Sequence, residues 1–315
     1  MKLWSLTLCL LAACGNAVAQ STGWQPEAGH MQIALWPDSP PNAKPMPGPE
    51  LAKTGNSLIA GKAVVSVTNV SQPTMTVYAP SGKNTRTAVV VFPGGGFQIL
   101  AMDLEGTEVC DWLTPRGVTC VLLKYRVPSE PYRWQCDCRP HNRALSVPSL
   151  DDAQRALRLV RLHAAEWKID PHKVGVLGFS AGGYLVAEVS TNFKRRVYKP
   201  VDAADKESSR PDFALAIYPG HLANEDDTLN RNVPVSRETP PTFILQAEDD
   251  HVDGVNQALV YYNALKNVDV PVEMHLFAHG GHAFGLRQTS EPITRWPDLA
   301  ETWMRTIGMI SARDQ

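Results

Sequence analysis

A serine between two glycines is the residue in this chain best suited to chemistry. Residues 178–182 have the spacing G-x-S-x-G, with Ser180 at the centre. An apolar run over 174–177 precedes them and an alanine-rich segment follows, so the pattern predicts a strand, a sharp turn and a helix. Such a turn exposes the serine hydroxyl and places helix N–H groups beside it, which suits a nucleophile that attacks a carbonyl group.

Three further groups each follow an apolar run typical of a buried strand. They are the glycines 94–96, the pair Asp249 and Asp250, and His282. Functional groups of open parallel sheets gather at the carboxyl ends of the strands, so these groups are expected to meet Ser180. The chain order serine, aspartate, histidine is the order of the α/β-hydrolase triad.

Strands alternating with helices must position these residues. Apolar runs predict strands at 74–79, 88–92, 119–125, 174–177, 213–218, 242–246 and 273–277. Helical patterns occur near 104–114, from Asp151 onward, after Ser180, and near 255–265 and 299–307. Asp151 and Asp152 are expected in the first turn of their helix, where acidic residues suit the helix dipole. The alternation predicts a mostly parallel central sheet with helices on both faces, and the polar segment 192–210 is expected on the surface.

Length and charge limit the class of protein. The chain has 315 residues, 43% of them hydrophobic, and a net charge of −2. The near-neutral charge argues against nucleic acid as a partner. Neither a repeat nor a linker divides the chain, so a single α/β domain is predicted over 62–315, preceded by an extended, proline-rich arm over 20–61.

The N-terminus predicts export. Residues 1–19 have one lysine, a short apolar core and an A-x-A site, which indicate a signal peptide cleaved after Ala19. A lipoprotein cleavage box ending at Cys14 is the alternative. Either route gives a periplasmic or secreted protein, and no later apolar run reaches the ~20 residues of a membrane span.

Four cysteines follow the leader: Cys110, Cys120, Cys136 and Cys138. An oxidising compartment permits disulfides, and four cysteines allow three pairings, among which the sequence does not choose. A structural disulfide is favoured over a metal site at 136–138, because no second ligand pair completes such a site. No metal and no cofactor are expected.

Several motifs together carry a resemblance to a known family. They are the segments at 93–97, 124–128, 152–156, 176–183, 248–252 and 280–286. As a set, they resemble the bacterial carbohydrate-esterase branch of the α/β-hydrolases, over about Val77 to Leu286. Its members are usually described as acetylxylan or feruloyl esterases. The resemblance implies a serine esterase that removes acetyl or other short acyl groups from plant cell-wall carbohydrate, such as acetylated xylan or its oligomers.

The resemblance also implies roles for individual residues. Ser180 would be the nucleophile, His282 the general base, and Asp250 the acid that orients the histidine. The backbone N–H groups of Ala181 and of Gly95 or Gly96 would form the oxyanion hole. Substrate contacts are expected from aromatic side chains: Phe97, Tyr132 and Trp134. Phe97 is also a possible oxyanion donor, and Tyr132 and Trp134 could equally be loop anchors.

The identity of the acid stays open at this point. His251 and Asp253 stand where the family often has Pro and Val, so Asp249 remains an alternative to Asp250. His279 is a rival base, although the family pattern places the catalytic histidine directly after the two glycines.

Other functions remain as alternatives. One is a feruloyl or general short-chain carboxylesterase. A second is a peptidase of the prolyl-oligopeptidase type, against which the absence of a large N-terminal domain counts. A third is a binding protein on an inactive hydrolase scaffold, which an intact set of serine, aspartate and histidine opposes.

Overall fold

The computed structural model describes residues 23–30, 32–43, 45–46, 48–127 and 147–311. The predicted signal peptide, Tyr132, Trp134 and the cysteines at 136 and 138 lie outside the described residues.

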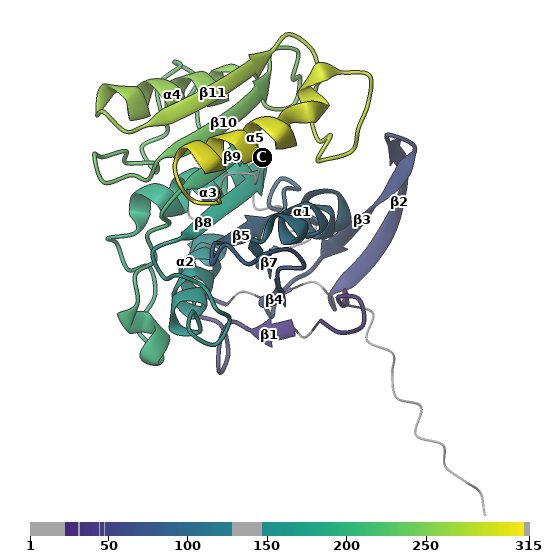
Figure 1. The fold of residues 1–315 in the computed structure, drawn as a ribbon. Helices are drawn as coiled ribbons and strands as arrows, with labels where there is room; N and C mark the ends of the chain where they lie inside the picture. Colours follow the sequence, from purple (N-terminus) through teal and green to yellow (C-terminus); the bar gives the residue numbers. More distant parts are fainter. Residues whose placement is uncertain (1–22, 31, 44, 47, 128–146, 312–315) are drawn as a thin grey trace, which may run out of the picture.

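A mostly parallel sheet of eight strands forms the centre of the molecule, with the order β1-β4-β7-β5-β8-β9-β10-β11 (Figure 1). Strand β4 pairs antiparallel with both β1 and β7, and the remaining neighbours are parallel. The strands are β1 (Gln32–Ala34), β4 (Thr74–Tyr78), β5 (Ala88–Phe92), β7 (Thr119–Lys124), β8 (Val174–Phe179), β9 (Ala214–Ile217), β10 (Thr242–Ala247) and β11 (Val272–Phe277). This architecture confirms the predicted α/β-hydrolase fold.

The two central strands show why the apolar runs were informative. Every residue of β5 and β8 is buried, since helices cover both faces of the sheet. Their register pairs Ala88 with Val174 and Phe92 with Gly178. The strands therefore end side by side, and the glycine-rich loop after β5 begins next to the turn that carries Ser180.

Helices lie on both faces of the sheet, as predicted (Figure 1). Helices α1 and α5 share one face, where Trp112 and Trp296 have ring centroids 5.7 Å apart. Helices α2 and α3 pack together on the other face. The helices are α1 (Glu108–Leu113), α2 (Val147–Leu162), α3 (Ala181–Asn192), α4 (Asn256–Asn267) and α5 (Trp296–Thr306), with a π-helical turn at Asp103–Thr107 and 3-10 turns at Thr114–Arg116, Ala203–Lys206 and Pro292–Arg295.

The segment predicted as an extended arm contributes to both sheets of the protein. Its residues 32–34 form the edge strand β1 of the main sheet. A second sheet contains β2 (Leu51–Ile59), β3 (Lys62–Thr68) and β6 (Leu100–Ala101), with the β2–β3 hairpin standing at one side of the molecule (Figure 1). The predicted boundary at residue 61 falls in the turn of this hairpin, so the structure shows no separate arm ending there.

The acidic pair Asp151 and Asp152 differs from expectation. Helix α2 begins at Val147, so these residues lie in its second turn and both are buried. The Asp152 carboxylate accepts hydrogen bonds at 2.9 Å from the Arg126 backbone N–H, from Arg126 Nη2 and from Trp36 Nε1. A buried ion pair, rather than the helix dipole, explains this carboxylate.

Removing the cation of this pair is expected to destabilise the fold. In Arg126→Met, two buried carboxylates lose their guanidinium, which typically costs about 3–5 kcal/mol. Urea unfolding would measure the change. The matched control is Arg237→Met, which breaks a surface pair with Asp269 in which both side chains are more than four-fifths exposed, and little change is expected. Equal midpoints for the two variants would contradict the prediction.

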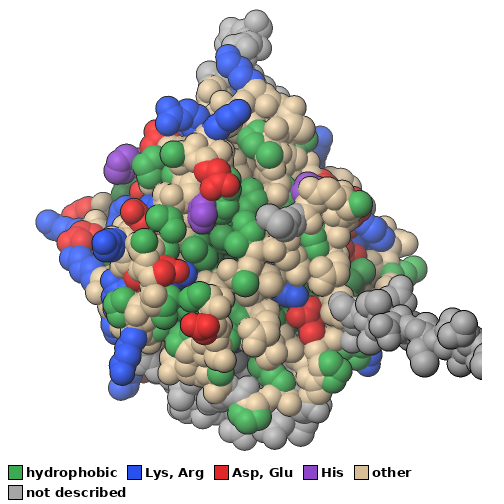
Figure 2. Space-filling view, turned by 90° about the horizontal axis from the view of Figure 1, so that it is seen from below, with side chains coloured by type: hydrophobic (Ala, Val, Ile, Leu, Met, Phe, Trp, Pro, Cys, Tyr) green, Lys and Arg blue, Asp and Glu red, His purple; other side chains and the backbone are tan. Residues whose placement is uncertain are grey.

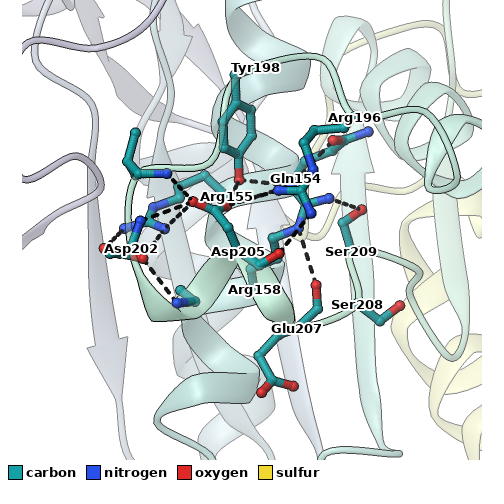
Figure 3. A network of polar contacts seen from close by, with 12 residues as sticks. Gln154, Arg155, Arg158, Arg196, Tyr198, Asp202, Asp205, Glu207, Ser208 and Ser209 are labelled. Atoms are coloured by element: carbon teal, nitrogen blue, oxygen red, sulfur yellow. Dashed lines mark hydrogen bonds and ion pairs between the residues drawn. The ribbon is translucent and has the colours of Figure 1, made fainter.

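The polar segment after α3 lies mostly on the surface, as predicted, but four of its residues are buried: Tyr198, Ala204, Asp205 and Ser209. It folds back onto α2, where Arg155 and Arg158 meet Tyr198 and Asp205 in a polar network (Figure 3). Tyr198 donates its hydroxyl to Asp205 at 2.6 Å, and Arg158 Nη1 donates to the Tyr198 hydroxyl at 2.7 Å. Arg155 and Arg158 of helix α2 therefore hold the segment 192–210 against the domain. The sequence did not indicate this contact, because it joins parts of the chain that are far apart.

One disulfide joins Cys110 in α1 to Cys120 in β7, with their Cα atoms 5.2 Å apart. This bond selects one of the pairings that the sequence left open. It ties a helix directly to a strand of the central sheet.

The surface is mixed in character. On the face seen in Figure 2, positive and negative side chains are interspersed with hydrophobic ones, so this face does not present the continuous basic patch that a polyanion needs. In the described part of the chain, the helices are too short or too polar to cross a membrane.

Candidate active site

Ser180 lies on a strained turn between β8 and α3. Its backbone has φ 51° and ψ −118°, which L-residues rarely adopt. Gly182 makes the turn possible, because a Cβ atom there would lie 2.1 Å from the carbonyl oxygen of Phe92. Helix α3 can therefore start directly against the end of β5, and the serine stands at the apex as the motif predicted.

Three side chains from three strand ends form a hydrogen-bonded row. His282 Nε2 lies 2.9 Å from Ser180 Oγ, and His282 Nδ1 lies 2.7 Å from Asp250 Oδ2. Ser180 follows β8, Asp250 follows β10 and His282 follows β11, so the parallel sheet brings them to one edge. This is the arrangement in which a histidine takes the proton of a serine while a carboxylate fixes the histidine tautomer.

Geometry favours Asp250 over Asp249 as the partner of His282. Asp250 is buried, and its Oδ1 atom accepts 2.9 Å hydrogen bonds from the backbone N–H groups of Val252 and Asp253. Asp249 instead accepts the backbone N–H of Gly281 at 2.8 Å, and it pairs with His279. Asp249 therefore supports the loop that carries His282.

The rival base lies away from the row. His279 is 75% exposed, and its Nδ1 lies 3.3 Å from Asp249 Oδ2. Ser180 Oγ lies 2.9 Å from His282 Nε2 instead. The structure therefore brings His282, and not His279, to the serine.

The glycine-rich loop lies beside Ser180. Gly95 and Gly96 have φ values of 130° and 61°, and the turn they form leads from β5 to β6. Within the described residues, the N–H groups of Gly95, Gly96 and Ala181 have no protein acceptor. Donors of this kind could bind an oxyanion formed on an acyl group at Ser180.

A buried carboxylate holds this loop in place. Glu105 accepts the N–H of Gly94 at 2.7 Å and the hydroxyl of Tyr218 at 2.8 Å. Tyr218 in turn accepts the N–H of Gly285 and packs its ring against His282, with centroids 5.0 Å apart. Burial raises the pKa of Glu105, although the two hydrogen bonds oppose the rise. Glu105 thus connects the glycine loop to the histidine loop, a positioning role that the sequence did not indicate.

A second carboxylate faces the serine. Asp253 Oδ2 accepts a hydrogen bond from Ser180 Oγ at 3.3 Å and lies 3.7 Å from His282 Nε2. Burial disfavours the imidazolium, but the hydrogen bond with Asp250 and the charges of Asp253, Asp250 and Glu105 outweigh it. The pKa of His282 is consequently raised above its ordinary value of 6.5.

This shift predicts a pH dependence. A general base must be neutral, so a raised pKa moves the acidic limb of kcat/KM for p-nitrophenyl acetate to a pH above 6.5. Asp253→Asn removes one negative charge near the imidazole and is expected to move the acidic limb to lower pH. Asp269→Asn removes a charge at the opposite ends of the strands and should leave it in place. A wild-type limb at or below pH 6.5 would contradict the prediction.

The predicted aromatic contacts are only partly described. Phe97 is buried at the end of the glycine-rich loop, and its ring lies 6.0 Å from both Tyr184 and His221. These side chains form an aromatic wall close to Ser180, since His221 Nδ1 lies 3.9 Å from Asp253. Tyr132 and Trp134 lie outside the described residues, so their proposed contact with sugar stays a prediction.

Comparison with known proteins places the chain in a class. The prolyl oligopeptidase family matches residues 149–305, and the family described as BD-FAE matches residues 75–218. An acetyl ester-xyloside bifunctional hydrolase from Caldicellulosiruptor lactoaceticus superposes with a TM-score of 0.67 at 30% identity, over 89% of this chain and 97% of that one. Esterase 2 from Thermogutta terrifontis, at 22% identity and a TM-score of 0.63, covers 85% of this chain and 98% of its own, and shares the fold.

Curated relatives agree with this class. An acetylxylan esterase from Xylanibacter ruminicola is 30% identical over 249 residues, covering 75% of this chain and 48% of that protein. An endo-1,4-beta-xylanase B from Butyrivibrio fibrisolvens is 28% identical over 233 residues, covering 67% and 34%. The chain belongs to the α/β-hydrolases, in the carbohydrate-esterase branch with these acetyl ester hydrolases. It spans about half or less of the length of the curated relatives it matches.

Proposed function

We propose that this protein is an exported serine esterase that removes acetyl groups from plant cell-wall carbohydrate, such as acetylated xylan or its oligomers. The observation that carries the proposal is the row Ser180–His282–Asp250, beside N–H groups of a glycine-rich loop that have no acceptor among the described residues. Relatives named for acetylxylan and acetyl ester-xyloside hydrolysis support the choice of substrate.

Acyl transfer would proceed in two steps. His282 takes the proton of Ser180 as Oγ attacks the ester carbonyl, and Asp250 stabilises the imidazolium that forms. The oxyanion binds the N–H groups of Ala181 and of Gly95 or Gly96. His282 returns its proton to the leaving sugar oxygen, which breaks the ester bond and leaves Ser180 acylated. A water molecule, deprotonated by His282, then attacks the acyl carbon. The bond between this carbon and Ser180 Oγ breaks, His282 returns the proton to Oγ, and the acid is released.

Chemistry and substrate class can be tested separately. Hydrolysis of p-nitrophenyl acetate by the wild type but not by Ser180→Ala would establish the acyl-transfer site; equal, slow rates for the two proteins would overturn it. A panel of acetylated xylan, feruloylated arabinoxylan and an aminoacyl-proline amide would then identify the substrate. Acetate release from xylan is expected to be fastest.

A peptidase remains an outcome of the same panel, because the prolyl oligopeptidase family matches the half of the chain that contains Ser180 and His282. If the amide were cleaved with the highest kcat/KM, the esterase proposal would be replaced by a peptidase.

Export has its own test. The pattern of residues 1–19 supports cleavage by signal peptidase, which would leave Gln20 as the first residue of the mature protein. N-terminal sequencing of the protein expressed with its leader would decide between this site and acylation at Cys14, which would leave a lipid-modified cysteine.

A further inference from the structure

Asp253 stands where neither the triad nor the oxyanion hole requires an acid. It lies on the loop after β10, and the conformation of that loop is fixed by hydrogen bonds. Gln246 Nε2 donates to the Asp253 carbonyl at 2.6 Å, and the Asp253 N–H donates to Asp250 at 2.9 Å. The residue is 7% exposed, and its carboxylate is turned toward Ser180.

The neighbouring backbone leaves a recess for this carboxylate. A Cβ atom on Gly220 would lie 2.4 Å from both oxygens of Asp253, so no other residue type fits at 220 without displacing the carboxylate. The Gly220 N–H donates to the carbonyl of Ser180 at 3.2 Å, which holds the recess against the turn of the nucleophile. The position of Asp253 is therefore built into the site.

The charge of Asp253 stabilises the protonated form of His282, but it does not help to bind an oxyanion formed at Ser180. A carboxylate only accepts hydrogen bonds, and its negative charge opposes the negative charge that develops on an attacked ester. A group of this kind beside the nucleophile is expected to interact with something on the substrate that donates a hydrogen bond.

Geometry indicates which part of the substrate Asp253 meets. The leaving oxygen of an ester must come within hydrogen-bond distance of His282 Nε2 to receive its proton. Asp253 Oδ2 lies 3.7 Å from the same Nε2 atom. A hydroxyl on the carbon next to the ester-bearing carbon is therefore in reach of the carboxylate.

We propose that Asp253 is a specificity-determining residue that accepts a hydrogen bond from a hydroxyl next to the scissile ester, and so selects esters of vicinal diols such as partly acetylated sugar units. The inference deepens the proposed esterase function and rests on it. It assigns to Asp253 a contact with the alcohol part of the substrate.

The size of the effect follows from the loss of a hydrogen bond to a charged group. A site built around such a bond discriminates against an analogue that lacks the hydroxyl, here by about 10- to 100-fold in kcat/KM. The discrimination should disappear when the carboxylate is replaced by an apolar side chain of similar shape.

The experiment compares acetate esters that differ in one hydroxyl. The substrates are a methyl xyloside carrying one acetyl group with a free hydroxyl on the adjacent carbon, and the same compound with that hydroxyl replaced by hydrogen. At a pH above the acidic limb, where His282 is neutral in both proteins, wild type should prefer the first by about 10- to 100-fold. Asp253→Val should show a preference below about 3-fold, with the loss confined to the hydroxyl-bearing ester. Asp269→Asn, an exposed charge change, should keep the wild-type preference.

Several results would overturn the proposal. They are a wild type without a preference, an Asp253→Val that loses equally on both esters, and an Asp253→Val that keeps the wild-type preference. Asp253→Ala, which also lacks a hydrogen-bond acceptor, serves if the Val variant folds poorly. If the wild type cleaves p-nitrophenyl acetate through Ser180 but shows no preference between the two xyloside esters, only the role of Asp253 is contradicted. If the wild type does not cleave p-nitrophenyl acetate, both the esterase function and the inference are contradicted.

Discussion

Ser180→Ala is expected to lower kcat/KM for p-nitrophenyl acetate by about 10⁴- to 10⁶-fold, because no acyl-enzyme can form without the hydroxyl and only binding and oxyanion donors remain. Stopped-flow and steady-state assays, at a pH where His282 is fully deprotonated, would measure the loss. The matched control is Ser190→Ala in α3, the helix that follows Ser180. Ser190 is also buried, and its hydroxyl has no hydrogen-bond partner among the described residues, so activity should be retained.

Covalent labelling gives an independent readout of the same residue. An organophosphate that reacts with activated serines should add one phosphoryl group to the peptide that contains Ser180, in wild type and in Ser190→Ala but not in Ser180→Ala. A label found on another serine would contradict the assignment of the nucleophile. Folding of each variant can be checked by its urea midpoint.

Asp250→Asn is expected to reduce kcat about 10⁴-fold, since an amide at this position stabilises the wrong tautomer of His282 and cannot stabilise its charge. This prediction rests on the buried 2.7 Å contact between Asp250 Oδ2 and His282 Nδ1. Asp249→Asn is the matched control, because it makes the same chemical change at the preceding residue. Its carboxylate binds the loop that holds His282, through His279 and the Gly281 N–H, so a loss within about 10-fold is expected.

The ratio of the two losses decides which aspartate orients the base. A larger loss in Asp249→Asn would reverse the assignment. Comparable losses in both variants would mean that the loop, rather than the carboxylate, limits the reaction. The pH profile separates these cases, because Asp250 contacts His282 and raises its pKa, whereas Asp249 contacts the loop that carries it.

Much of the architecture was predictable from local patterns. The apolar runs of β5 and β8 identified central strands, since a strand covered on both faces must be apolar throughout. The G-x-S-x-G spacing identified the turn at Ser180, because only small residues allow a helix to start so close to a neighbouring strand. The chain order of serine, aspartate and histidine then predicted which strand ends meet.

Other features depend on contacts between distant residues, and local patterns do not record these. Asp249 and Asp250 are identical side chains next to one another, and only the path of the loop after β10 decides which of them reaches His282. The disulfide between Cys110 and Cys120 likewise depends on how α1 packs against β7. Asp152 was expected to interact favourably with the helix dipole, but in the structure it forms an ion pair with Arg126.

By itself, the sequence determined the fold class, the nucleophile turn and the set of residues among which the site is formed, because strand burial and tight turns constrain residue type locally. Only the tertiary structure decided that Asp250 pairs with His282, that Glu105 joins the two active-site loops, and that Asp253 faces Ser180. These outcomes depend on the direction of each side chain, which is set by backbone geometry and by neighbours far away in the chain.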